Sequence, residues 1–197
     1  MNLETPKSIV ADARVVRTRE ALCEAMTALV SEQPLDAITV RAIAARAGVG
    51  YATFFRHYAD KDALLADVAD ALNRELLQRV APMLMQKDRL AAARSLCAFV
   101  EERLPICTAL IAGGAGDTVR AEMLRQSMQS VAKARGRKPE NALDDLIVFH
   151  TVSATLNLLA WWLGRRDEVS AETMAEIIER TVLTPAGGLK RAAPGGM

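Results

Sequence analysis

The sequence predicts an all-α protein, and three observations support this. Of its 197 residues, 51% are hydrophobic but only 4% are aromatic, and residues that favour helices over strands dominate, notably Ala, Leu, Arg and Glu. Only 11 Gly and 7 Pro interrupt the chain. Apolar side chains recur at intervals of three and four residues, as they do along one face of a helix. The length suits one domain or two small ones with a substantial core.

The first predicted helix spans residues 14–30. Its apolar positions share one helical face and are Leu22, Met26, Leu29 and Val30. Pro34 ends this helix because proline cannot continue it. Thr39 then has the hydroxyl that caps a second helix, expected over residues 40–47.

A tight glycine turn follows the second helix. Gly48 supplies the positive φ that closes it, and Gly50 begins a third short helix that reaches about His57. Two short helices joined in this way predict a helix-turn-helix.

The middle of the chain predicts three more helices. Asp60 is expected to cap a fourth helix whose apolar stripe continues to Pro82. A fifth covers residues 90–104, and a short sixth starts at Pro105 and stops in the glycine-rich residues 113–116.

The C-terminal part predicts a seventh helix over about residues 117–134, an eighth over residues 141–163 and a ninth that Ser170 caps and Pro185 ends. The basic run at residues 133–138 is interpreted as a solvated loop rather than a second nucleic-acid contact.

The eighth helix is apolar nearly all round and requires cover on several sides, from the core or from a second subunit. Residues 146–164 carry no charge, and their length is at the threshold for a membrane span. Polar residues interrupt the segment: His150, Thr151, Ser153, Thr155 and Asn157. A buried helix of a soluble bundle is therefore favoured over a membrane span.

Composition also bears on location and partners. The 25 Lys and Arg against 24 Asp and Glu leave a formal charge of +1, which by itself argues against a nucleic-acid partner. Cys23, Cys97 and Cys107 cannot all pair within one chain, and the first residues do not form a signal peptide. We therefore expect a cytoplasmic protein with core cysteines.

Residues 39–64, TVRAIAARAGVGYATFFRHYADKDAL, resemble the DNA-binding signature of the tetracycline-repressor (TetR) family. The order of nine helices, with an apolar eighth and an amphipathic ninth, is similar to the C-terminal half of that family. The resemblance implies a helix-turn-helix DNA-binding domain over residues 1–60. It also implies a ligand-binding and dimerisation domain over residues 61–185, connected by the fourth helix, and leaves residues 186–197 as a disordered tail.

The charge is distributed unevenly along the chain. Between residues 35 and 61 there are four basic residues, Arg41, Arg46, Arg56 and Lys61, against two acidic ones. A homodimer would present this basic patch twice, and its binding to DNA would weaken with salt. The resemblance therefore implies double-stranded DNA with a palindromic operator as the partner.

The third helix matches the recognition helix of the family, which lies in the major groove. Gly50 begins it, and Tyr51, Ala52 and Thr53 are the expected readers of base edges. Arg41 matches a position from which family members reach a base, and a solvated or phosphate-bound arginine is an equal alternative.

Thr39, His57 and Lys61 match phosphate-contacting positions of the family. Two positions depart from its pattern: Phe55 stands where Tyr is usual, and Tyr58 stands where Phe is usual. Either the phenol has moved or one backbone contact is lost. The core of the domain is expected to contain Ile43, Ala44, Val49, Phe54 and Leu64.

The resemblance also implies a small, largely apolar effector of unknown identity, bound in the C-terminal bundle. The candidate ligand-binding residues occupy expected inward positions and are Phe99, Arg103, Leu110, Met123, Phe149, His150, Ser153, Asn157 and Trp161. For His150, a satisfied core or interface position is an open alternative.

The eighth and ninth helices are the expected dimer interface. Its candidate residues, for each of which intrachain core is an equal alternative, are Leu158, Trp161, Trp162, Met174, Ile177 and Ile178.

The sequence also bears on two other classes of function. An enzyme is disfavoured because the chain has two His and lacks Cys-x-x-Cys, His-Glu-x-x-His, Gly-x-Ser-x-Gly and a nucleotide-binding loop. The same absences predict no cofactor and no metal site. A regulator that acts as an activator, needs no ligand or has lost DNA binding is the nearer alternative.

Overall fold

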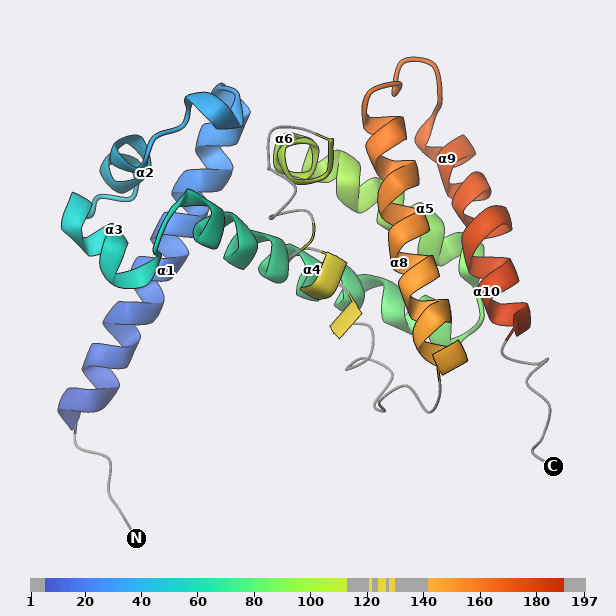
Figure 1. The fold of residues 1–197 in the computed structure, drawn as a ribbon, viewed down its shortest axis with the longest axis horizontal. Helices are drawn as coiled ribbons and strands as arrows, with labels where there is room; N and C mark the ends of the chain where they lie inside the picture. Colours follow the sequence, from blue (N-terminus) through green and yellow to red (C-terminus); the bar gives the residue numbers. More distant parts are fainter. Residues whose placement is uncertain (1–5, 113–120, 122–123, 127, 130–141, 190–197) are drawn as a thin grey trace, which may run out of the picture. The chain divides into compact units, whose positions relative to one another are not determined.

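The computed structural model describes residues 6–112, 121, 124–126, 128–129 and 142–189. All regular structure in these residues is helical, which confirms the all-α prediction (Figure 1). The chain forms two compact units, an N-terminal unit (Met1–Val68) and a C-terminal unit (Ala69–Met197). The division falls within helix α4, so this helix contributes residues to both units.

The N-terminal unit contains three helices and the start of a fourth. They are α1 (Pro6–Glu32), α2 (Val40–Arg46), α3 (Tyr51–His57) and α4 (Lys61–Met85), with a short 3-10 turn, η1 (Leu35–Ala37), after α1. α1 begins earlier than the apolar pattern predicted. The pairs α1 with α2 and α2 with α3 are in contact, which produces the predicted helix-turn-helix.

The predicted caps of this unit are confirmed. The Thr39 hydroxyl accepts a hydrogen bond from the backbone N–H of Ala42 at 3.2 Å, and the Asp60 carboxylate accepts one from that of Ala63 at 2.8 Å. Gly48 has φ +67°, a conformation that strains any residue with a Cβ. These features are local, and the sequence therefore identified them.

The core of the N-terminal unit joins the inner faces of its helices. Its fully buried side chains include Leu22, Met26, Ile43, Phe54, Leu64 and Leu65. Of the expected core residues, only Val49 is half-buried rather than buried.

The C-terminal unit continues α4 and adds helices in sequence order. They are α5 (Arg89–Glu102), α6 (Leu104–Cys107), the π-turn η2 (Thr108–Ala112), α8 (Ala142–Leu163), α9 (Ala171–Ile178), the π-turn η3 (Glu179–Leu183) and α10 (Thr184–Leu189). α5 packs on α9, and α8 contacts η2, α9 and α10 (Figure 1). The predicted seventh helix lies mostly outside the described residues, and Met123 and residues 133–138 lie wholly outside them.

Two prolines expected to end helices instead lie inside them. α4 continues through Pro82 to Met85 at the loss of one backbone hydrogen bond. Pro185 is the second residue of α10, which follows directly on η3, so the helical path continues through it. Residues 186–189 of the expected disordered tail are therefore helical, and residues 190–197 lie outside the described part. Ser170 caps α9 as predicted, accepting from the N–H of Thr173 at 3.1 Å.

A single hydrophobic cluster joins α5, α6, α8 and α9. Its members are Ala93, Cys97, Val100, Cys107, Leu159, Trp162, Met174, Ala175 and Ile178. The Trp162 indole N–H donates to the carbonyl of Val169 at 2.8 Å, so its polar atom is also satisfied.

Within α8, the segment Asp145–Leu163 is long and apolar enough to cross a membrane, with a mean hydropathy of 1.5, and 28% of it is buried. Length and composition alone do not separate a span from the core helix of a soluble bundle. Leu159 and Trp162, both on this segment, belong to the cluster with α5 and α9, which is the packing expected of a bundle helix.

Candidate nucleic-acid interface and cavity

Helix α3 exposes aromatic side chains on one face and buries another on the opposite face. Phe54 is 0% exposed in the core, whereas Tyr51 is 51% exposed and Phe55 is 46% exposed. Tyr51 and Phe55 share a face because they are four residues apart, and their ring centroids are 5.1 Å apart, edge to face. Ala52 is also exposed, and Thr53 is half-buried. The predicted base readers therefore lie at or near the surface of the unit.

Arg41 of α2 lies beside this face. Its guanidinium carbon is 5.6 Å from the centroid of the Tyr51 ring, an arrangement that a cation–π attraction stabilises. Within the described residues it has no carboxylate partner, so its charge is available to an external anion or base.

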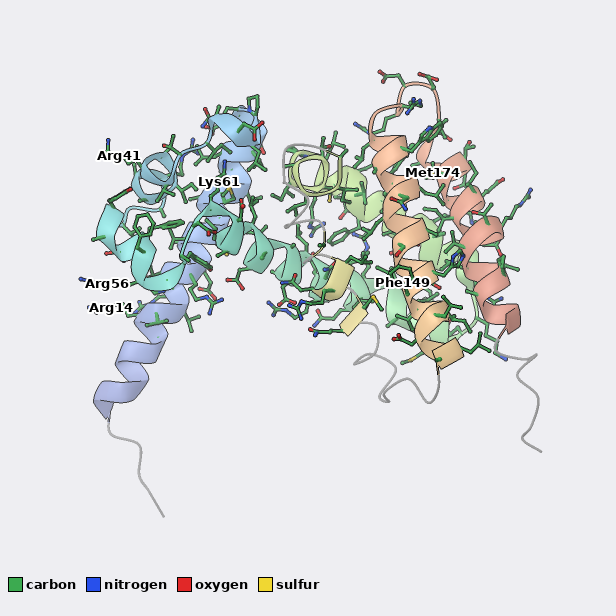
Figure 2. The ribbon with its side chains drawn as sticks, viewed as in Figure 1. Arg14, Arg41, Arg56, Lys61, Phe149 and Met174 are labelled. Atoms are coloured by element: carbon green, nitrogen blue, oxygen red, sulfur yellow. The ribbon has the colours of Figure 1, made fainter. Side chains whose placement is uncertain are left out.

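A groove of about 450 Å³ separates the first half of α1 from α3. Arg14 and Thr18 line it from α1, and Gly50, Arg56 and His57 line it from the helix-turn-helix. Figure 2 shows Arg14 and Arg56 next to each other. In the described part of the chain neither arginine forms an ion pair. The groove is thus lined by two arginines without a counter-charge and by His57.

The sequence did not identify Arg14 as a site residue. The available signal was a cluster of basic residues within six positions of α1, namely Arg14, Arg17 and Arg19. The tertiary structure separates them: Arg19 forms an ion pair with Asp67 at 2.8 Å, and Arg17 donates to the carbonyl of Ala13 at 3.3 Å.

Two of the four basic residues predicted for the patch have partners inside the protein. The Lys61 ammonium donates to the carbonyls of Leu35 at 2.8 Å and Ile38 at 3.4 Å, and so ties the end of η1 to the start of α4. Arg46 pairs with Glu32 of α1. The Lys61 ammonium has three donors and retains one for a phosphate. The Thr39 hydroxyl is exposed and, although it caps α2, can still donate its proton.

Tyr58 is buried and cannot replace the hydroxyl that Phe55 lacks. It is 5% exposed, and its phenol donates to Asp67 Oδ2, which also accepts from Arg19. The Cys23 Sγ lies 3.7 Å from the phenol oxygen. Burial, together with the hydrogen bond to Asp67, raises the pKa of Tyr58. The Tyr58 phenol therefore links α1, the end of α3 and α4 and does not take over a phosphate contact, which leaves the loss of one backbone contact as the prediction.

The C-terminal unit contains two adjoining cavities, of about 150 and 50 Å³. Both are lined by α4, α5 and α8, and five residues line both cavities: Asn73, Leu76, Leu96, Leu156 and Leu159. The larger cavity also reaches Thr151 and Thr155 of α8, and the smaller one reaches Phe99 and Leu110. Among the described residues, no charged side chain lines either cavity.

The expected inward face of α8 is corrected by the structure. Phe149 (Figure 2) is 46% exposed, Trp161 is 47% exposed, and His150 and Asn157 are also exposed. The cavity-lining face is offset from this stripe. Because α8 is apolar nearly all round, its sequence does not distinguish the inner face from the outer one.

Of the other candidate ligand-binding residues, some line a cavity and some do not. Phe99 and Leu110 line the smaller cavity, as expected. Ser153 is half-buried, and its hydroxyl has no hydrogen-bond partner in the described part of the chain, but it lines neither cavity. Met123 lies outside the described residues.

Arg103 lies above the Phe99 ring, with its guanidinium carbon 4.2 Å from the centroid, but does not line a cavity. It pairs with Glu75 and, at 3.0 Å, with Glu102. Arg79 pairs with the same Glu102 at 2.6 Å, and hydrogen bonds from Arg79 and Arg103 lower the pKa of Glu102 to about 2. The charge of Arg103 is therefore already balanced by carboxylates.

Three candidates for the dimer interface belong to the intrachain core instead. Trp162, Met174 and Ile178 are 0% exposed, so a second subunit cannot touch them without unpacking the cluster. Leu158 and Ile177 are partly buried against the same cluster, and Trp161 alone of the six is exposed. The exposed residues of α9 are polar.

The exposed apolar side chains of the C-terminal unit are concentrated on α8. On α8 they are Leu143, Leu146, Phe149 and Trp161, and two more, Leu84 and Met85, lie at the end of α4.

Comparisons with known proteins agree with this architecture. A family model described as bacterial regulatory proteins, tetR family, matches residues 22–68. A relative from Bacillus subtilis (strain 168), described as an uncharacterized HTH-type transcriptional regulator, YxbF, is 36% identical over 78 residues. That match covers 39% of this chain and 20% of the relative, so the chain matches about a fifth of the relative's length.

Solved structures match over nearly the whole chain. A TetR transcriptional regulator from Rhodococcus sp. RHA1 superposes with a TM-score of 0.66 at 20% identity, covering 91% of this chain and 98% of that one. The Thermus thermophilus repressor FadR, in complex with lauroyl-CoA, superposes with a TM-score of 0.62 at 19% identity, covering 90% and 100%. At these identities the likeness establishes a common fold.

Proposed function

This chain belongs to the tetR family of bacterial regulatory proteins, and from that premise we propose that it is a cytoplasmic, homodimeric repressor. It binds a palindromic operator in double-stranded DNA and is released by a small molecule. The observation that carries the proposal is the exposed face of α3, where Tyr51 and Phe55 lie in solvent beside Arg41, which has no carboxylate partner among the described residues. Exposed aromatic side chains next to free cations are unusual on a surface without a partner.

In this proposal α3 enters the major groove and Tyr51, Ala52 and Thr53 face the base edges. Ala52 suits the methyl group of thymine, and Arg41 reaches either a guanine or a phosphate. Tyr51 supports Arg41 by lying under its guanidinium, 5.6 Å away.

Phosphate contacts come from around α3. Arg14, Arg56 and His57 share one groove, which suits a backbone phosphate because the two arginines have no protein counter-charge in the described chain. Thr39 and the remaining donor of Lys61 add weaker contacts. A missing hydroxyl at Phe55 leaves one contact fewer than a tyrosine would make.

Dimerisation is assigned to the exposed face of α8. Leu143, Leu146, Phe149 and Trp161 are each at least 40% exposed in the single chain. A two-fold pairing of α8 with its copy would cover these side chains and present two recognition helices to successive major grooves.

Effector release requires a ligand that binds two states with different affinity. The apolar cavities of the C-terminal unit provide a binding site for this ligand. The structure of FadR, which has the same fold, is of a complex with lauroyl-CoA. α4 is continuous from Lys61 to Met85 and carries both Asn73 of the cavities and Asp67 of the Tyr58 network. A displacement of α4 would therefore move Asp67 and so act on Tyr58, at the end of α3, and on Arg19 of α1.

The test is an in-vitro selection from random duplexes with the full-length protein, followed by affinity measurements on the recovered site. The double variant Arg41→Ala, Arg56→Ala should lose most of its binding while its circular dichroism is unchanged. Arg180→Ala, which removes an exposed arginine of η3 in the C-terminal unit, is the control. Recovery of no palindrome, or unaltered binding by the double variant, would contradict the proposal.

A further inference from the structure

We propose that the effector is a small neutral molecule that joins an apolar group of about six carbon atoms to a carbonyl-type acceptor, and that Asn73 receives this acceptor. The inference rests on the proposed function only in taking the cavities of the C-terminal unit as the effector site. It follows from three properties of these cavities among the described residues: their size, the buried and unsatisfied donor of Asn73, and the absence of a charged lining side chain.

The volume of the cavities determines the size of the apolar group of the effector. The larger cavity has a volume of about 150 Å³ and is lined almost entirely by aliphatic side chains of α4, α5 and α8. An apolar cavity of that size holds one benzene molecule, which is about six carbon atoms. The adjoining cavity of about 50 Å³ holds only a short extension.

Asn73 lies where the two cavities meet, since it lines both. Its Nδ2 is buried and has no hydrogen-bond partner within the described residues. A buried amide that donates to nothing is costly, and an acceptor supplied by a ligand would remove that cost. Thr151 cannot play this part, because its hydroxyl already donates to the carbonyl of Ile147 at 2.7 Å.

The lack of charged lining side chains among the described residues indicates that the effector is neutral. No Lys, Arg or His among the described residues lines either cavity. Arg79 of α4, and Arg103 above the cavity-lining Phe99, are already paired with Glu75 and Glu102. A carboxylate ligand would therefore be desolvated without a counter-charge, which is strongly unfavourable. The acceptor is accordingly an uncharged oxygen such as that of a ketone, ester or amide.

The test uses three probes of nearly equal shape: acetophenone, cumene and benzoate. Each has a phenyl ring carrying a branched group of three heavy atoms, and they differ in that the group is a ketone, a hydrocarbon or an anion. Calorimetric titration of the full-length protein should give acetophenone a roughly three- to tenfold higher affinity than cumene, as expected for one neutral hydrogen bond. Benzoate should bind at least about tenfold more weakly than acetophenone.

Asn73→Leu removes the donor at similar side-chain volume and should abolish the preference for acetophenone over cumene. Gln78→Leu, an exposed position on the same helix that lines neither cavity, should keep it. The preference is a ratio measured within each variant, so a change in overall stability does not imitate the result. Asn73→Ala gives a second measure in case leucine closes the cavity.

Three results would overturn the inference. Tightest binding of benzoate would refute a neutral ligand, and equal affinities for acetophenone and cumene in the unaltered protein would refute the role of Asn73. Absence of binding by any probe at millimolar concentration would refute the stated ligand class. A protein that binds DNA but none of the probes contradicts this inference alone, whereas one that binds acetophenone but no DNA contradicts the proposed function alone.

Discussion

Replacing Tyr58 by Phe should destabilise the N-terminal unit without opening a cavity. The change removes only the hydroxyl that donates to Asp67, while the ring, which is 5% exposed, keeps its packing. A hydrogen bond to a charged group contributes about 1.5–3 kcal/mol. The Asp67 side chain is 25% exposed and still accepts from Arg19, so part of that contribution is screened. We expect a loss of about 1–2 kcal/mol in the free energy of unfolding.

The two units can be followed separately during urea unfolding. Both tryptophans, Trp161 and Trp162, belong to the C-terminal unit, so indole fluorescence reports that unit, whereas far-UV circular dichroism reports all helices. Tyr58→Phe should shift the dichroism transition to lower urea and leave the fluorescence transition of an independently unfolding C-terminal unit in place.

Tyr51→Phe provides a matched control, because it removes a hydroxyl from a tyrosine that is 51% exposed. It should change the free energy of unfolding by less than about 0.5 kcal/mol. If Tyr58→Phe costs no more than this control, the hydrogen bond to Asp67 does not stabilise the unit, and the explanation given for the exchanged Phe55 and Tyr58 is wrong.

Three further predictions follow from charge and burial. Arg14→Ala and Arg56→Ala should each lower the magnitude of the salt dependence of log K for DNA by about 0.9 per protomer, which is about 1.8 for the homodimer, and an unchanged slope would remove that residue from the phosphate contacts. Glu102, whose pKa is lowered from 4.5 to about 2 by its arginine partners, stabilises the fold above its unfolded pKa and loses this effect as pH falls through the folded one. The difference in the free energy of unfolding between wild type and Glu102→Gln should therefore shrink as pH falls from 4.5 to about 2, as measured by denaturant titrations. A constant difference would contradict the stabilising role of the ionised Glu102. Burial raises the pKa of Cys97 to about 12 and that of Cys107 to about 11, so at about pH 8 both thiols stay protonated. In a Cys23→Ser background, which removes the half-buried third thiol, they should react with a disulfide reagent only after unfolding, and rapid reaction of that native protein would show that they are accessible.

The local features of the N-terminal unit were predictable from the sequence. Thr39 and Asp60 cap the helices that follow them, and Gly48 adopts the positive φ assigned to it. These features depend on hydrogen bonds that reach three residues along the chain, or on the conformation of one residue. Pro82 and Pro185 were expected to end their helices, but the helical path continues through both, because tertiary packing can override the local preference of a residue.

The available charges of the candidate interface were not predictable. The sequence does not distinguish which of its four basic residues have partners inside the protein: Arg41, Arg46, Arg56 and Lys61. The structure shows that Arg46 and Lys61 have partners within the protein, whereas Arg41 and Arg56 have no ion-pair partner in the described chain. Arg14, distant in sequence, lies on the same groove as Arg56.

The sequence by itself determined the all-α class, the helix-turn-helix with its caps and the family signature over residues 39–64, because these depend on neighbouring residues. The tertiary structure decided which face of α8 lines the cavities, that Trp162 is core rather than interface, and that Tyr58 binds Asp67. Such outcomes depend on contacts between residues far apart in the chain. An evenly apolar helix or an isolated basic residue carries no local signal of its partner.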